Sequence, residues 1–226
     1  MHITKCRLIL QDTLFYATRE MGTLYETERY IHNYALSYAL FGSRLIGVPY
    51  FCDSYTPRYA ENMEILNQSG IYVTPARPLK WDYLLITWKM AQVNYYRKPE
   101  RFGKRGNYPE NIGRAKELAP ESEFEFVILS RGHVEVPRWI RLGKWMSKAS
   151  VETRQETVTN ERTGQFVCGH SVNPLDIAAE TRIFTYDLIS MPPVSLLDRV
   201  YMSGAYYQLQ DETCIPAGLA YRFPKG

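Results

Sequence analysis

The sequence has no long apolar run and no apolar segment at its start. Its longest purely apolar runs, such as residues 126–129, fall far short of the roughly 20 residues that a membrane-spanning helix needs. The first five residues alternate polar and apolar side chains and lack the continuous apolar core of a secretory signal. These absences exclude a membrane-spanning helix and lead us to expect a cytoplasmic protein.

Cysteines are few and widely separated. No Cys-x-x-Cys motif occurs among Cys6, Cys52, Cys168 and Cys214, which excludes a zinc ribbon and a thioredoxin-like redox site. We therefore expect reduced, buried thiols, no structural metal and no cofactor.

Motifs of common enzymatic chemistry are also absent. There is no P-loop, Gly-x-Gly-x-x-Gly, Gly-x-Ser-x-Gly or His-Glu-x-x-His, and the acidic residues are too dispersed for a two-metal nuclease site. The four histidines are isolated in sequence. His32 is the histidine that a metal-independent ribonuclease could use for acid-base cleavage. A structural role is favoured because the spacing supplies no partner for it.

The chain is rich in apolar and aromatic residues. Its 226 residues are 45% hydrophobic and include 18 tyrosines, nine phenylalanines and four tryptophans. This composition can bury enough apolar surface to offset the entropy lost on ordering. The length fits one large domain or two small ones.

Charge is segregated along the chain. The 27 basic and 24 acidic residues give a net charge of +3, yet residues 95–116 hold seven basic and two acidic residues, and residues 131–154 hold six and two. Such segregation favours a surface that binds a polyanion, since each neutralised phosphate releases condensed counterions. The alternative is a solvated loop whose charges only maintain solubility.

Aromatic residues lie within or beside both basic windows. Single-stranded bases stack on aromatic faces while Arg and Lys hold the phosphate backbone, so the combination indicates a nucleic-acid interface. The rings concerned are Tyr95, Tyr96, Phe102, Tyr108, Trp139 and Trp145.

Hydrophobic periodicity predicts strands and two helices in the first half. Residues 2–10 alternate as a half-buried strand. A Thr-x-x-Glu capping box at 23–26 predicts the start of a helix that ends at Gly42. A Thr-Pro pair at 56–57 predicts the start of a second helix, which ends at Gly70.

The pattern that follows predicts a projecting arm. Residues 71–74 form a short strand, and a longer strand starts at Tyr83 and changes phase near 90–91, which indicates a β-bulge. Residues 97–120 lack apolar periodicity and form a long basic loop. Alternation resumes at 123–128 as a return strand, so the segment is predicted to be a β-hairpin arm, or thumb.

The second half is predicted to be rich in strands. Basic and large apolar residues alternate over 138–148, and an Asn-Pro pair at 173–174 predicts one short helix. Strands are expected at 151–158, at 165–169 after a turn at 160–164, at 182–189, at 200–209 and near 219–223.

Two blocks of sequence carry a family resemblance. The first is residues 14–22 (LFYATREMG), continuing through 24–28 (LYETE) and 32–36 (HNYAL); the second is residues 137–149 (PRWIRLGKWMSKA). With these blocks the chain resembles the Cas-five family of CRISPR repeat-associated RNA-binding proteins, and within it the Csc-one subunits of the type I-D Cascade effector complex. The resemblance covers most of the chain.

The resemblance implies an α+β fold. It comprises a ferredoxin-like (RRM-like) core with an inserted β-hairpin thumb and a β-rich C-terminal region. Together with the basic loop, this predicts an RNA-binding domain at 1–150, including a thumb at about 95–122, and a β-rich region at 151–226 packed on it. The best match to the glycine-rich loop of related proteins is residues 141–144.

The resemblance also implies a function. The protein would be a non-catalytic subunit of an antiviral CRISPR complex that caps the 5′ handle of CRISPR RNA. It would contact the large and backbone subunits and lie near the protospacer-adjacent motif (PAM) of target DNA. A separate subunit is expected to process precursor RNA in type I-D systems, so catalysis here would be redundant.

We therefore expect an RNA-binding surface built on the arm and on the segment after it. Two alternatives stay open: a metal-independent endoribonuclease that processes precursor CRISPR RNA, and a structural protein-protein module without RNA affinity. The expected RNA-binding residues are Lys98, Arg101, Phe102, Lys104, Arg105, Tyr108, Arg114, Arg138, Trp139, Arg141, Lys144 and Lys148, with Arg19 and Tyr25 from the first resembling block.

Overall fold

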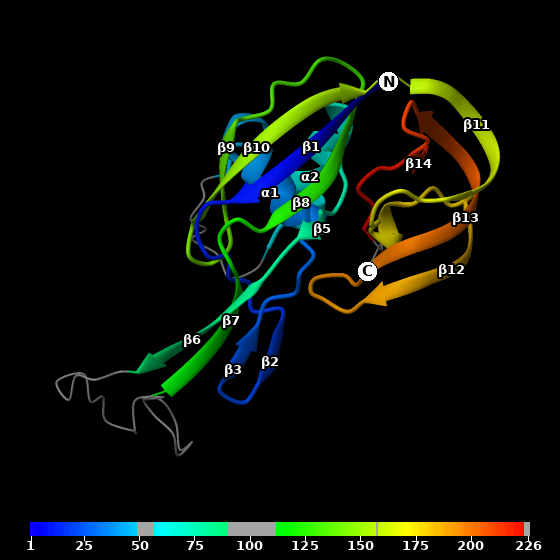
Figure 1. Ribbon diagram of the computed structural model, residues 1–226. Coiled ribbons are helices and arrows are strands. Elements are labelled where there is room, and N and C mark those ends of the chain that lie inside the picture. The colour runs from blue at the N-terminus through cyan, green and yellow to red at the C-terminus, as the bar shows by residue number, and fades with distance from the viewer. Residues whose placement is uncertain (49–56, 90–111, 157, 224–226) are drawn as a thin grey trace.

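The computed structural model describes residues 1–48, 57–89, 112–156 and 158–223, arranged as Figure 1 shows. The protein is mixed α/β and consists mostly of strands. The α-helices in the described ranges are α1 (Asn33–Phe41) and α2 (Tyr59–Gln68). No helix among the described residues is long and apolar enough to cross a membrane.

An antiparallel sheet of six strands forms the centre of the molecule. Its strands are β1 (His2–Leu10), β4 (Ile71–Val73), β5 (Arg77–Lys80), β8 (Glu123–Ser130), β9 (Trp139–Leu142) and β10 (Ser147–Glu156). The order is β4-β8-β1-β10-β9, and β5 also pairs with β8. The strands expected at 2–10 and 71–74 are confirmed.

Alternation along β1 divides the central sheet into a buried and an open face. Cys6, Leu8 and Leu10 are buried while Arg7 is exposed, as the period-two pattern predicts. Apolar residues of α1 and α2 belong to the same core cluster as these side chains. The helices therefore cover the buried face.

The first helix begins later than the capping box predicts. Residues Leu24–Glu26 form β3, which pairs with β2 (Arg19–Met21). The helix α1 begins after His32, whose Nδ1 accepts a hydrogen bond from the Tyr34 N–H at 3.2 Å. The capping-box prediction is wrong because strand pairing outweighs a local helix-start signal.

Glycines end both helices, although not as simply as the sequence indicates. The chain continues past Gly42 into a π-helical turn that ends at Gly47, where φ is 75°. Gly70 follows α2 with φ of 67°, so the predicted end of the second helix is confirmed. The helix starts at Tyr59, and its predicted cap, Thr56, lies outside the described residues.

A second sheet projects from the body as an arm (Figure 1). In it β6 (Tyr83–Lys89) pairs antiparallel with β7 (Ile112–Leu118), and β7 also pairs parallel with β3, giving the order β2-β3-β7-β6. The loop prediction for 97–120 is therefore wrong at 112–118. The sequence of β7 lacks apolar alternation, but β7 is nevertheless a strand because it is hydrogen-bonded to β3 on one side and to β6 on the other.

The return strand is also assigned differently. Residues 123–128 do form a strand, but they belong to β8 in the central sheet. The strand that pairs with β6 in the arm is β7, so the prediction that 123–128 returns the arm is wrong. The β-bulge near 90–91 and the tip of the basic loop lie outside the described residues.

A third sheet of four strands forms the C-terminal part of the chain. It contains β11 (Val158–Val167), β12 (Arg182–Ile189), β13 (Leu196–Leu209) and β14 (Cys214–Pro216). The strand at 182–189 is confirmed, and so is the short helix, a 3-10 turn at Pro174–Asp176 capped by Asn173. The turn expected at 160–164 is wrong because these residues pair continuously with β13. The strand predicted near 219–223 is wrong because these five residues, all of them described, form no strand.

A buried polar network joins the end of the chain to α1 and the central sheet. The Tyr221 hydroxyl accepts a hydrogen bond from the Val73 N–H at 3.0 Å and lies 2.6 Å from Ser37 Oγ. The Asp176 carboxylate accepts hydrogen bonds from Asn33 at 2.8 Å and from the Tyr72 hydroxyl at 2.9 Å.

The mixed α/β class is confirmed, whereas the ferredoxin-like core and the division near residue 150 stay predictions.

Candidate nucleic-acid interface

The expected RNA-binding residues form three groups, two of which the structure describes. The first group lies outside the described residues: Lys98, Arg101, Phe102, Lys104, Arg105 and Tyr108. The second group lies on the hairpin formed by β9 and β10: Arg138, Trp139, Arg141, Lys144 and Lys148. The third lies on the arm sheet: Arg19, Tyr25 and Arg114.

The β9–β10 hairpin sorts its side chains by strand alternation. Ile140 and Leu142 are buried in the core, whereas Trp139 is 52% exposed and Arg141 is exposed. The strand register places Lys148 of β10 opposite Arg141. Because residues opposite each other in a sheet point to the same side, basic and aromatic side chains share the outer face of this hairpin.

The turn of this hairpin is fastened to the preceding chain. Gly143 has φ of 73° and its N–H donates to the Tyr16 hydroxyl at 3.0 Å. The Lys144 N–H donates to the Phe15 carbonyl at 2.9 Å, and the exposed Trp145 ring stacks on Phe15 at 5.4 Å between centroids. The turn therefore presents Lys144 and Trp145 on a defined backbone.

Contacts within the hairpin orient its cations without neutralising them. The Lys148 ammonium lies 4.1 Å from the Trp139 ring centroid, a cation–π contact. The Arg141 guanidinium donates to the Met146 carbonyl at 2.9 Å. Both side chains keep donors available for a ligand.

The charge of the hairpin differs from that of the adjoining open face of the central sheet. In the part of the chain that the structure describes, Arg138, Arg141, Lys144 and Lys148 form no ion pair. On the open face, by contrast, Arg7 pairs with Glu123 at 2.6 Å, and Arg77 pairs with Glu125 at 2.9 Å. The Asp12 carboxylate accepts a hydrogen bond from the Lys148 backbone N–H at 2.9 Å, so the hairpin carries a surplus of positive charge rather than a set of paired charges.

The candidates on the arm sheet are placed differently. Arg19 is exposed and lies 3.5 Å from Glu26, which lies 3.5 Å from Lys116 as well. Tyr25 is half-buried and Arg114 is exposed on the neighbouring strand. Arg19 thus shares a carboxylate with a second cation, in contrast to the hairpin residues.

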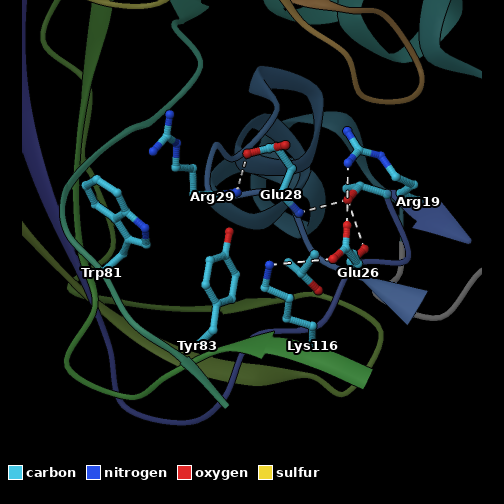
Figure 2. Close-up of a pocket in the computed structure, with 9 residues that line it drawn as sticks. Arg19, Glu26, Glu28, Arg29, Trp81, Tyr83 and Lys116 are labelled. Carbon is cyan, nitrogen blue, oxygen red and sulfur yellow. Dashed lines mark hydrogen bonds and ion pairs between the residues drawn. The ribbon is translucent and has the colours of Figure 1, made fainter. Parts of the chain in front are cut away.

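A hollow of about 230 Å³ lies at the base of the arm. Figure 2 shows Trp81 and Arg29 on one side of it, Arg19 and Glu26 on the other, and Tyr83 between them. The full set of lining residues is Thr18, Arg19, Glu26, Thr27, Glu28, Arg29, Trp81, Tyr83 and Lys116. Apart from Arg19, sequence reasoning missed them because they come from three separate segments with no common spacing.

Comparison with known proteins establishes the affiliation. A family model described as type I-D CRISPR-associated protein Cas5/Csc1 matches residues 1–224. The chain belongs to this family. It is therefore a subunit of a type I-D CRISPR complex, and the resemblance drawn from the sequence is confirmed.

Other comparisons gave more distant results. No curated protein matches the chain. A chain in a cryo-EM structure of the type III-B Cmr-beta complex, bound to cognate target RNA and AMPPnP, is 9% identical with a TM-score of 0.45, over 88% of this chain and 83% of that one. A crystal structure of a CRISPR protein from Archaeoglobus fulgidus is 10% identical with a TM-score of 0.43, over 98% of this chain and 100% of that one.

Two histidines of this Cas5/Csc1 family member are buried in structural settings. His32 is 4% exposed and caps α1. His170 is 2% exposed, and its Nδ1 lies 2.7 Å from the Ser171 carbonyl. Burial lowers the pKa of each imidazole to about 4, so both are neutral at pH 7. An RNA strand has no access to His32 in this position.

Two of the described thiols are buried and stay protonated at neutral pH. Cys6 and Cys168 are buried and free, and burial raises the pKa of each to about 12. Cys214 is half-buried, and Cys52 lies outside the described residues. The described residues contain no group of His, Cys, Asp and Glu side chains able to hold a metal ion.

Proposed function

We propose that this type I-D complex subunit binds single-stranded RNA without cleaving it, and that the RNA is the 5′ handle of CRISPR RNA, which the subunit caps. The observation that carries the proposal is the β9–β10 hairpin, which carries two exposed tryptophans and four cations, Arg138, Arg141, Lys144 and Lys148, that form no ion pair among the described residues. The predicted basic arm would add further cations to this RNA-binding surface.

The chemistry of the hairpin suits a single strand. Unpaired bases offer flat faces that stack on Trp139 or Trp145, and the phosphates between them are attracted to the adjacent cations. Stacking of this kind tolerates different bases because each has a π-face. The hairpin therefore accounts for affinity, and sequence selection has to come from elsewhere.

The experiment is a salt titration of RNA binding by fluorescence anisotropy. The test variant is Arg138→Ala/Lys144→Ala. The matched control is Arg7→Ala/Arg77→Ala, which removes the same charge from side chains that already have carboxylate partners. If each lost cation frees one phosphate, the slope of log K against log salt falls by about 1.4 in the test variant, since each single-strand phosphate contributes about 0.7. An unchanged slope, or an equal change in the control, would remove the hairpin from the interface.

The endoribonuclease alternative requires a histidine that RNA can reach. A metal-independent ribonuclease based on His32 would need that imidazole at the surface, whereas it caps α1 from a buried position. We propose that His32 is structural and that the subunit is not catalytic. A His32-dependent product from repeat RNA in EDTA would support the ribonuclease instead.

Contacts with the large and backbone subunits are also part of the proposal. Three alternate residues of the edge strand β12 expose apolar side chains, Phe184 at 38%, Tyr186 at 52% and Leu188 at 60%. A row of this kind favours contact with a protein neighbour, and its position away from the hairpin leaves both surfaces available.

The third alternative, a structural module without RNA affinity, predicts no RNA binding even at low salt. Location near the PAM of target DNA and in the cytoplasm are included in the proposal on the basis of the family.

A further inference from the structure

We propose that the hollow at the base of the arm holds one unpaired ribonucleotide whose base carries an exocyclic amino group. The inference rests on the proposed function, because the same RNA strand would supply the nucleotide. At about 230 Å³ the hollow is smaller than the roughly 300–1,000 Å³ of sites for drug-sized ligands. It therefore suits one base rather than a longer segment.

Aromatic rings paired with cations line the hollow. The Arg29 guanidinium lies 4.9 Å from the ring centroid of Trp81, which is 39% exposed. The Lys116 ammonium lies 4.4 Å from the Tyr83 ring centroid. In Figure 2 the Tyr83 hydroxyl points toward Glu28 and Arg29. Unpaired bases stack on indole and guanidinium planes of this kind.

Glu28 supplies the element that selects the base. Its backbone N–H donates to Thr18 Oγ1 at 2.8 Å, which fixes the residue at the rim. One carboxylate oxygen accepts from the Arg29 N–H at 2.9 Å, and within the described residues Glu28 forms no ion pair. The second oxygen is an acceptor for a donor on the ligand. A carboxylate accepts from the N4 amino group of cytosine, whereas uracil presents an oxygen at that position and is repelled.

Glu26 differs from Glu28 because cations surround its carboxylate. Arg19 and Lys116 both lie 3.5 Å from its carboxylate. This side of the hollow therefore holds two cations against one acid, and the surplus positive charge suits the phosphate of the bound nucleotide. The hollow thus offers Glu28 as an acceptor for the base and Arg19 and Lys116 as cations for the phosphate.

The hollow is connected to the hairpin through a short piece of chain. Phe15 lies under Trp145 of the hairpin turn, and Thr18 lines the hollow. Residues 15 and 18 are three positions apart in the chain, so their Cα atoms are separated by no more than about 11 Å. One RNA strand can therefore contact the hairpin and place a neighbouring nucleotide in the hollow.

The test compares binding of ten-nucleotide oligo(C) and oligo(U) RNA at equal salt. The wild-type protein is expected to bind oligo(C) about tenfold more tightly, because a hydrogen bond to a charged acceptor distinguishes the two bases. In Glu28→Gln the side-chain oxygen stays with the Arg29 N–H and the NH₂ faces the ligand, so the preference disappears or reverses. The control, Glu180→Gln, makes the same charge change at an exposed site beside the C-terminal sheet and keeps the preference.

The outcomes separate this inference from the proposed function. RNA binding with the expected salt slope, but with equal affinity for the two oligonucleotides or an unchanged preference in Glu28→Gln, overturns the nucleotide site alone. No RNA binding at low salt overturns both. Trp81→Leu is a second variant: loss of stacking lowers affinity for both oligonucleotides by about tenfold and leaves their ratio unchanged, and an unaltered affinity would count against the site.

Discussion

At the scale of single residues, burial sets the behaviour of the ionisable groups. Burial lowers the pKa of His32 and His170 to about 4, and it raises the pKa of Asp176 to about 6 despite hydrogen bonds that favour the carboxylate. The histidines bind protons more strongly in the unfolded chain, so they stabilise the fold above pH 6.5, and this contribution is lost as the pH falls toward 4. Asp176 acts in the opposite direction between about pH 6 and 4.

The variant His32→Asn tests this assignment. Asparagine caps a helix as well as histidine does here but carries no titrating proton. Between pH 7 and pH 5 the wild-type protein is expected to lose about 2 kcal/mol more unfolding free energy than the variant, measured by urea denaturation at both pH values. His133→Asn, at an exposed position, serves as the control and keeps the wild-type loss. An equal loss in all three proteins would refute the buried-imidazole explanation.

At the scale of elements, the hairpin turn depends on one glycine. Gly143 has φ of 73°, and a Cβ there would lie 2.8 Å from the Phe15 carbonyl oxygen and 2.7 Å from Leu14 Cδ1. The left-handed conformation and the close backbone approach both require glycine. The turn that orients Lys144 and Trp145 therefore has no room for a side chain.

We expect Gly143→Ala to lower the unfolding free energy by about 1–3 kcal/mol, read from urea denaturation, and to weaken RNA binding in proportion to the loss of hairpin order. Gly132→Ala is the matched control, because a Cβ at that glycine meets nothing within 4 Å. Equal stability of the two variants would show that the turn tolerates a side chain and that its close contacts are not required.

The elements also show what local sequence patterns can predict. Alternation places β1 correctly because it has a clear period of two, and the basic-aromatic run of the hairpin is consecutive in sequence. The strand β7 escapes detection because Gly113, Arg114 and Lys116 show no apolar alternation; pairing with β6 and β3 makes it a strand. The capping box at 23–26 fails for the same reason, since partners distant in sequence decide the conformation.

At the scale of the whole molecule, charge is arranged by pairing as much as by position. The sequence shows a cluster of cations over 131–154 but not which of them have carboxylate partners. In the structure Arg154 pairs with Glu156 at 3.2 Å, while the four hairpin cations have no such partner among the described residues. The hollow at the arm base is also a property of the whole fold, because only tertiary packing brings Glu28, Trp81 and Lys116 together.

The most direct test of the central claim is ultraviolet crosslinking of the full-length protein to single-stranded repeat RNA, with the crosslinked peptides identified by mass spectrometry. The account predicts crosslinks within residues 138–148, with Trp139 and Trp145 as the expected sites because their exposed rings would stack on bases. Crosslinks that avoid this segment and map instead to the C-terminal sheet would contradict it.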